Sequence, residues 1–102
     1  MKINITEITS SIKLYSNNKF PDLLAYASLK FIDENNRYFI SNGFTIRKSK
    51  FNDQPYLALP SKKSGAGFFK YALIEETLKK EIEKEIIDQY NRETIPIINE
   101  QL

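Results

Sequence analysis

The chain has 102 residues, a formal net charge of +2, no cysteine and no histidine. This length is typical of one domain and too short for two ordinary ones. The lack of cysteine and histidine excludes disulfides, thiolate metal sites and catalytic triads built on either residue. No apolar run approaches the roughly 20 residues needed to cross a bilayer, and the N-terminus has no signal-peptide h-region. We therefore expect one cytoplasmic domain with no metal, no cofactor and no membrane partner.

The first extended segment is marked by apolar side chains between Ile5 and Leu14. The step from Ile5 to Ile8 breaks strict alternation, which predicts a bulge or a change of face there. Residues 15–22 are rich in turn formers and form a connection.

Two further strands follow, at residues 24–32 and 38–47, joined by a turn at residues 33–37. Apolar and polar side chains alternate with period two in the first of them, as in a half-buried strand. In the second, four apolar residues are expected on one face, and Gly43 marks a close approach or a kink. These four residues are Tyr38, Ile40, Phe44 and Ile46.

A short apolar strand is predicted at residues 56–59, after a polar connection at residues 49–55. Pro60 cannot donate a hydrogen bond to a neighbouring strand and should end it. Residues 61–67 are predicted to form a flexible basic loop, and residues 68–71 are predicted to form a last short strand. Strands so close in sequence usually pair antiparallel.

The clearest element is a helix whose apolar stripe recurs every fourth residue. The stripe consists of Ile74, Leu78, Ile82, Ile86 and Tyr90, widened by Ile87. Glu75 and Glu76 fall in the first turn, where the helix dipole favours negative charge, and each has a lysine four residues later. The stripe is expected to face the core, with a partner helix as the alternative. The fold class is therefore α+β: a mostly antiparallel sheet of four to five strands followed by one long C-terminal helix.

Pro96 disfavours simple continuation of this helix past residue 91. We accordingly divide the chain into one domain at residues 1–91 and a C-terminal tail at residues 92–102. The tail contains the isoleucines Ile95, Ile97 and Ile98, which require cover from the same chain or from a second one.

Charge is unevenly distributed along the chain, which is informative about partners. Between residues 47 and 70 there are six basic residues and one acid, Asp53. The basic residues are Arg47, Lys48, Lys50, Lys62, Lys63 and Lys70. Four aromatic residues lie among them and a fifth, Tyr71, directly follows Lys70. Lysine and arginine neutralise phosphates, and aromatic rings stack on unpaired bases. The alternative is that these aromatics are core and these lysines a solvated face.

Two other features resemble catalytic sites. Lys62 and Lys63 stand beside Gly65-Ala66-Gly67, but neither a P-loop nor a dinucleotide fingerprint is present. The acids of the helix are spread around its circumference with lysines between them, as on a solvated face. We assign no catalytic or metal-binding residue and expect no enzymatic activity.

The order of segments resembles the SpoVG family, the small bacterial septation and sporulation regulators. Its most specific part is Leu57-Ala58-Leu59-Pro60-Ser61-Lys62-Lys63, which is similar to the family's apolar strand ending in Met-Pro-Ser-Arg-Lys. Ile5-Thr6-Glu7-Ile8 resembles the family's first strand, and residues 24–31 its second. The resemblance covers roughly residues 3 to 91 and leaves the tail from Arg92 unmatched.

The resemblance implies a mostly antiparallel sheet with a C-terminal helix, a homodimer, and a regulator that binds DNA and/or RNA in the cytoplasm, where it can associate with the nucleoid. The family's basic pair after Pro-Ser falls on Lys62 and Lys63, and Lys70 lies in the region of its nucleic-acid contacts. We take Arg47, Lys48 and Lys50 as further candidate contacts. Two alternatives stand beside this one: a protein-interaction module that uses the helix face or the tail, and an enzyme that uses carboxylates alone.

Overall fold

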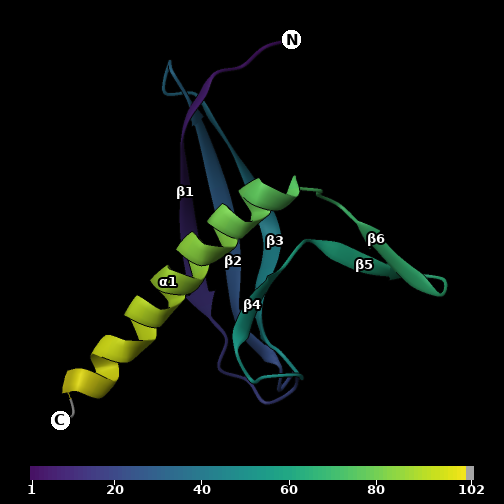
Figure 1. Cartoon of the computed structure of the whole chain (residues 1–102), viewed down its shortest axis with the longest axis vertical. Helices are drawn as coiled ribbons and strands as arrows, with labels where there is room; N and C mark the ends of the chain where they lie inside the picture. Colours follow the sequence, from purple (N-terminus) through teal and green to yellow (C-terminus); the bar gives the residue numbers. More distant parts are fainter. Residues whose placement is uncertain (101–102) are drawn as a thin grey trace.

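A computed structural model (Figure 1) describes residues 1–100 of the chain, and side chains as far as residue 94. Four strands form one antiparallel sheet in the order β1-β2-β3-β4, two more form a separate hairpin, and a helix follows. The elements are β1 (Ile5–Leu14), β2 (Leu23–Asp33), β3 (Tyr38–Lys48), β4 (Pro55–Ala58), β5 (Ser61–Ser64), β6 (Gly67–Lys70) and α1 (Glu76–Glu100). The predicted α+β class, with an antiparallel sheet and one C-terminal helix, is confirmed.

β1 pairs antiparallel with β2, and their register shifts between Ile5 and Glu7. One extra residue, Thr6, therefore lies in β1, and it lets Ile5 and Ile8 share a face despite their spacing of three. The bulge expected at this step is confirmed. Across the strands Ile8 is opposite Phe31, and Ile12 is opposite Ala27, so these four apolar side chains lie on one side of the sheet.

A second bulge lies in the middle of β3, where the register with β2 shifts between Ala27 and Leu29. Ser41 is opposite Leu29 and Phe44 is opposite Ala27, so two residues of β3, Asn42 and Gly43, stand where β2 has only Ser28. Gly43 has a φ of 93°, and a Cβ at this position would lie 3.2 Å from Pro60 Cβ. The close approach predicted at this glycine is confirmed.

The extra residue reverses the alternation of faces along β3. Phe44 and Ile46 are buried, whereas Tyr38 and Ile40 point to the opposite side and remain exposed. The expectation that all four side chains share one face was therefore wrong. An uninterrupted period of two would have placed them together, but the bulge intervenes.

Residues 61–67, expected to be a flexible loop, instead form β5, a two-residue turn and the start of β6. Gly65 supplies the positive φ of 59° in this turn, and Ser61 is opposite Lys70 at the other end of the ladder. The last short strand, predicted at residues 68–71, is confirmed as β6 (Gly67–Lys70). Its partner was missed because Lys62 and Lys63 lack the alternation of a half-buried strand.

α1 begins after Glu75, whose carboxylate accepts hydrogen bonds from the backbone N–H groups of Thr77 (3.0 Å) and Leu78 (2.9 Å). These two groups have no partner within the helix, so the side chain acts as an N-terminal cap. The Thr77 hydroxyl also donates to this carboxylate, and these bonds together lower the pKa of Glu75. The predicted Glu76–Lys80 ion pair is present at 3.5 Å, but no Glu75–Lys79 pair is found because the cap occupies Glu75.

The helix extends to Glu100, so the expectation that it ends before Pro96 was wrong. Proline removes one hydrogen bond and crowds the preceding turn, but it can also lie within a helix whose other bonds persist. The first residues of the predicted tail, from Arg92, are thus helical. The side chains of Ile95, Ile97 and Ile98 lie outside the described residues.

One hydrophobic cluster joins β2, β3, β4 and α1. Its largest fully buried side chains are Phe44, Leu29, Ile46, Leu57 and Ile86. Burial of each such side chain stabilises the fold by roughly 1.5–3 kcal/mol. Figure 1 shows α1 crossing the sheet obliquely on this side, so the predicted packing of its apolar stripe against the core is confirmed for Ile82 and Ile86.

Two side-chain hydrogen bonds attach the helix to the two outer strands. Glu83 Oε2 accepts from the backbone N–H of Leu57 in β4 at 2.9 Å, and Ser10 in β1 donates to Gln89 Oε1 at 2.5 Å. Glu83 was expected to lie on a solvated face. Its carboxylate instead satisfies a backbone N–H of an edge strand, which would otherwise be open to pairing with another chain.

Candidate nucleic-acid interface

The β5–β6 hairpin projects from the body of the protein (Figure 1). All eight residues of its two strands are exposed, including Phe68 (72%) and Phe69 (54%). A hydrogen bond from the N–H of Tyr71 to the carbonyl of Pro60, 2.8 Å long, closes its base. The hairpin therefore presents both of its faces to the surroundings.

The strand register divides the hairpin side chains between two faces, because residues opposite each other share a face and successive residues alternate. The face that we call the lysine face carries Ser61, Lys63, Phe68 and Lys70. The face that we call the aromatic face carries Lys62, Phe69 and Tyr71, with the rings of Phe69 and Tyr71 packed edge to face at 5.4 Å.

Three predicted contact residues, Lys62, Lys63 and Lys70, thus lie on one small hairpin but not on one face of it. No acidic residue lies in the hairpin, and none of its lysines forms an ion pair with any residue that the structure describes. Their positive charge is therefore uncompensated by neighbouring carboxylates. An anion that approaches the hairpin can therefore bind these ammonium groups without first displacing a carboxylate of the described residues.

The other three predicted residues form a separate group at the far end of β4. Arg47 and Lys48 end β3, and Lys50 lies in the loop that follows, where they line a shallow pocket with Asp22, Phe51 and Tyr56. Asp53 lies 3.9 Å from Lys48 Nζ, and Asp22 lines the same pocket, so this group is partly neutralised. The structure does not gather the six basic residues into one cluster.

Sequence reasoning missed a third surface, the side of the sheet turned away from α1. The register assigns to this side, which we call the open face, Lys13, Tyr26, Lys30, Tyr38, Ile40, Arg47 and Tyr56. Tyr26, Tyr38 and Tyr56 are 44%, 61% and 42% exposed. Part of this surface could have been predicted from β2, where Tyr26 and Lys30 alternate with the core residues. The residues of β3 on this face could not, because the bulge at Gly43 changes which of them face away from the core.

Each tyrosine of the open face has a cationic side chain beside it. Lys30 Nζ lies 4.3 Å from the centre of the Tyr38 ring. Lys13 is directly opposite Tyr26, and Arg47 is directly opposite Tyr56. Among the described residues, none of these three cations takes part in an ion pair. Glu7 in β1 is the one acid that the register places on this face of the described sheet.

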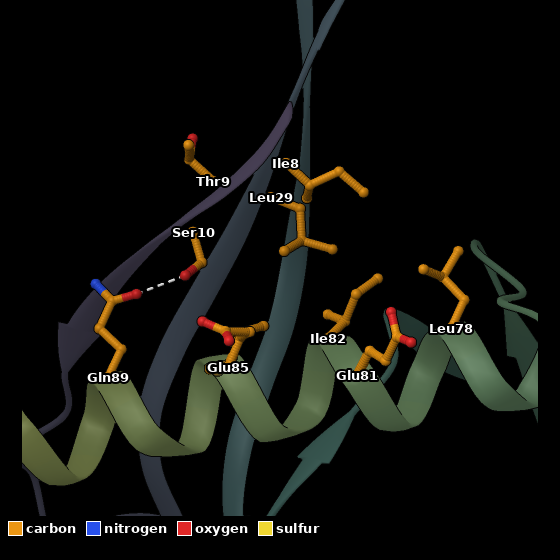
Figure 2. A pocket seen from close by; sticks show the side chains of 10 residues that line it. Ile8, Thr9, Ser10, Leu29, Leu78, Glu81, Ile82, Glu85 and Gln89 are labelled. Carbon is orange, nitrogen blue, oxygen red and sulfur yellow. Dashed lines mark hydrogen bonds between the residues drawn. The ribbon is translucent and has the colours of Figure 1, made fainter. Parts of the chain in front are cut away.

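A groove runs between β1 and α1 on the other side of the sheet (Figure 2). Its floor is apolar, with Ile8 and Leu29 from the sheet and Ile82 from the helix. Glu81 and Glu85 project from the helix into the same space. The groove can therefore accept apolar side chains that are accompanied by positive charge.

Asp88, another acid of α1, has a partner on the helix itself. Asp88 Oδ2 lies 2.9 Å from Lys84 Nζ, and this bond and charge raise the pKa of Lys84. Within the described part of the chain, no group of three or more acidic residues could hold a metal ion. No helix in the described residues is long and apolar enough to cross a membrane.

Comparison of the chain with protein-family models, curated proteins and solved structures finds no match. What is established is therefore the class of the fold: an α+β protein with a four-stranded antiparallel sheet, one covering helix and a projecting basic hairpin.

Proposed function

We propose that this protein is a nucleic-acid-binding regulator that acts as a homodimer and is not an enzyme. The observation that carries the proposal is the exposed hairpin, whose three lysines have no carboxylate partner among the described residues. The resemblance of the sequence at residues 57–63 to the SpoVG family supports the same function.

Phosphate binding is assigned to the lysine face of the hairpin. Lys63 and Lys70 flank the exposed ring of Phe68 on this face, so two ammonium groups can approach successive phosphates of one strand. Binding of this kind releases counterions and is largely independent of sequence. The group at Arg47, Lys48 and Lys50 would extend the contact to a longer nucleic acid.

The homodimer is assigned to the aromatic face. A two-stranded hairpin is at best marginally stable alone in water, so the exposed rings of Phe69 and Tyr71 require cover. The groove of a second copy offers an apolar floor for these rings and two carboxylates, Glu81 and Glu85, for Lys62. Because each copy has both a hairpin and a groove, two copies can exchange hairpins reciprocally in a dimer with twofold symmetry.

The test is a titration of a fluorescent 20-base-pair duplex, followed by anisotropy at several salt concentrations. Affinity of the wild type is expected to fall steeply with salt, with a log–log slope of about −0.9 for each phosphate neutralised. In a Lys63→Ala/Lys70→Ala variant the slope should become shallower by about 1–2 per copy of the chain in contact with the duplex.

A matched control is Lys79→Ala/Lys80→Ala, which removes the same charge from the first turns of α1. Its slope should equal that of the wild type. Equal loss in both double variants would mean that total charge, and not the hairpin, sets the affinity. Absence of salt-sensitive binding by the wild type, to this duplex and to a single strand of the same length, would reject nucleic acid as the ligand and favour the protein-interaction alternative.

A further inference from the structure

The open face of the sheet has a chemistry that the hairpin does not explain. Solvated sheet faces usually carry isolated polar side chains, but this one carries three exposed tyrosines. The fold places a cation beside each tyrosine: Lys30 lies over the Tyr38 ring, and strand register places Lys13 opposite Tyr26 and Arg47 opposite Tyr56. Such a surface combines flat aromatic rings with donors for negative charge.

We propose that the open face is a binding platform for single-stranded nucleic acid, on which unpaired bases stack against Tyr26, Tyr38 and Tyr56. This inference rests on the proposed function and deepens it, because it names the form of nucleic acid and a second surface. Every base has a π face, so stacking on tyrosine requires unpaired bases but no particular sequence. In a duplex the bases are already stacked on one another and cannot reach the rings.

The arrangement of cations fits a phosphate backbone that runs over the face. Lys13 is paired across strands with Tyr26, and Arg47 with Tyr56, at the spacing of directly opposed residues, roughly 4.5–5.5 Å between Cβ atoms. A base stacked on either ring therefore has its phosphate within reach of a long basic side chain. Arg47 Nε donates to Thr45 Oγ1 at 3.1 Å, which orients its guanidinium along the face.

Tyr38 has the most accessible ring of the three, with 61% of the residue exposed. Lys30 contacts one side of this ring by a cation–π interaction, which helps to hold the ring in place, and a base would stack on the opposite side. The neighbouring residues Ile32 and Ile40 on the same face are apolar, so the ring has an apolar surrounding. Such pre-ordering reduces the entropy that binding must otherwise remove.

The net charge of the face decides between nucleic acid and an acidic or apolar protein surface. Lys13, Lys30 and Arg47 outnumber Glu7 and the Asp22 carboxylate that shares a pocket with Arg47, so the face repels a second copy of itself and attracts a polyanion. An acidic protein partner would neutralise the positive charge of the face, but it would have no bases to stack on the tyrosine rings that stand beside the cations. Binding of an acidic protein in place of an oligonucleotide is therefore one outcome that the experiment below must distinguish.

The experiment compares a fluorescent 20-nucleotide oligothymidylate with a 20-base-pair duplex in anisotropy titrations of the full chain. A Tyr26→Leu/Tyr38→Leu variant should lose at least tenfold in affinity for the single strand, because each lost base stack corresponds to roughly fivefold to 150-fold and two stacks are lost. Its affinity for the duplex should be unchanged. The variant Tyr26→Phe/Tyr38→Phe keeps both rings and should bind the single strand as the wild type does.

A second measurement locates the strand without relying on a loss of binding. The chain contains no tryptophan, so Tyr38→Trp introduces a single one on the open face and Tyr71→Trp a single one on the hairpin. The oligothymidylate should quench the fluorescence of Tyr38→Trp by stacking. In Tyr71→Trp it should cause a smaller change.

Equal loss of single-strand and duplex affinity in the leucine variant, or an unquenched Tyr38→Trp, would overturn the platform while leaving the hairpin as the nucleic-acid site. If the wild type binds neither nucleic acid, the proposed function fails and the platform fails with it. A leucine variant that binds the single strand as tightly as the phenylalanine variant would also reject stacking on these rings.

Discussion

Gly43 is the residue on which the division between buried and open faces depends. Its φ of 93° lies in the region that side chains with a Cβ rarely adopt, and Pro60 stands close to the vacant Cβ position. The bulge that Gly43 permits moves Tyr38 and Ile40 to the open face and keeps Phe44 in the core. One glycine thus sets the composition of two surfaces.

Replacement of this glycine tests that role. Gly43→Ala should destabilise the fold by more than about 1 kcal/mol, because a Cβ is strained at positive φ and would also crowd Pro60. Gly67→Ala is the control, since no atom lies within 4 Å of its vacant Cβ position, and it should change stability by less than about 0.5 kcal/mol. Urea unfolding of both variants measures the difference. Equal effects would contradict the assignment of the strain to position 43.

Asp33, the last residue of β2, is buried just before the turn to β3. Burial raises the pKa of this carboxyl, but hydrogen bonds from the N–H groups of Arg37 and Asn35, together with the Arg37 guanidinium at 2.7 Å, outweigh burial and lower the pKa below its ordinary value of 3.8. A carboxyl whose pKa is lower in the folded protein stabilises the fold above its unfolded pKa. This contribution disappears as the pH falls through the folded pKa.

The pH dependence of stability therefore has a defined sign. At pH 7 the wild type should melt at a higher temperature than Asp33→Asn. Asparagine lacks the negative charge that forms an ion pair with the Arg37 guanidinium. Below pH of about 3.8 the difference should shrink, since the carboxyl is then protonated first in the unfolded chain and, at still lower pH, in the folded protein. Thermal unfolding between pH 7 and pH 2.5 measures the gap. A gap that stays constant across this range would mean that the charge of Asp33 contributes nothing.

At the scale of elements, α1 is attached to the sheet mainly by a few apolar side chains. Ile86 is fully buried, whereas Leu78 of the same stripe is 40% exposed beside the groove. A spacing of four residues exceeds the helical repeat of 3.6, so the stripe slants around the helix and its ends leave the core. The centre of the stripe therefore contributes most to stability.

Truncation along the stripe should reveal this gradient. Ile86→Ala should lower the free energy of unfolding by roughly 2–5 kcal/mol, through lost burial and a residual cavity. Leu78→Ala, with similar loss of volume at a partly exposed site, should cost much less. Chemical denaturation monitored by the helical circular dichroism gives both values. Equal costs would show that the two positions are packed alike in solution.

The elements differ in how far sequence alone could predict them. β1, β2 and α1 were located correctly because apolar residues repeat at the period of a strand or a helix over eight or more residues. β5 was missed because its four residues, Ser61–Ser64, have no apolar member. The continuation of α1 past Pro96 was missed because proline usually ends or kinks a helix, although it removes only one hydrogen bond of the helix.

At the scale of the whole molecule, the projecting hairpin bears on assembly. If the aromatic face is covered by a second copy, Phe69→Ser should convert a dimer to a monomer, because one polar group would replace the central ring of the interface. Phe51→Ser is a matched control, since this phenylalanine is fully exposed in the loop before β4. Sedimentation at several concentrations gives the masses. A wild type that is monomeric throughout would reject the homodimer.

Dimer formation would also make stability depend on concentration. A contact that forms only between folded copies raises the melting temperature as protein concentration rises. The wild type should show this rise and Phe69→Ser should not. A rise of the same size in both would place the contact between copies elsewhere than the aromatic face.

The candidate site was predictable in part. The six basic residues were identified from sequence, but their division into a hairpin group and a group near Asp22 and Asp53 was not. The division arises because β4 separates Lys48 from Lys62, and proximity in sequence does not reveal which way the chain turns at Pro60. The tyrosines of the open face were missed because strand register, not spacing, brings them together.

Sequence by itself determined the class of the fold, the bulge near Ile5 and the helix stripe, because these depend on periodicities among residues close along the chain. Tertiary structure alone decided which face Tyr38 occupies, that Glu83 bonds to Leu57, and which lysines share a hairpin face. The physical reason is that these relations join residues across separate strands or between helix and sheet. Their geometry is set by pairing and packing, which local patterns do not encode.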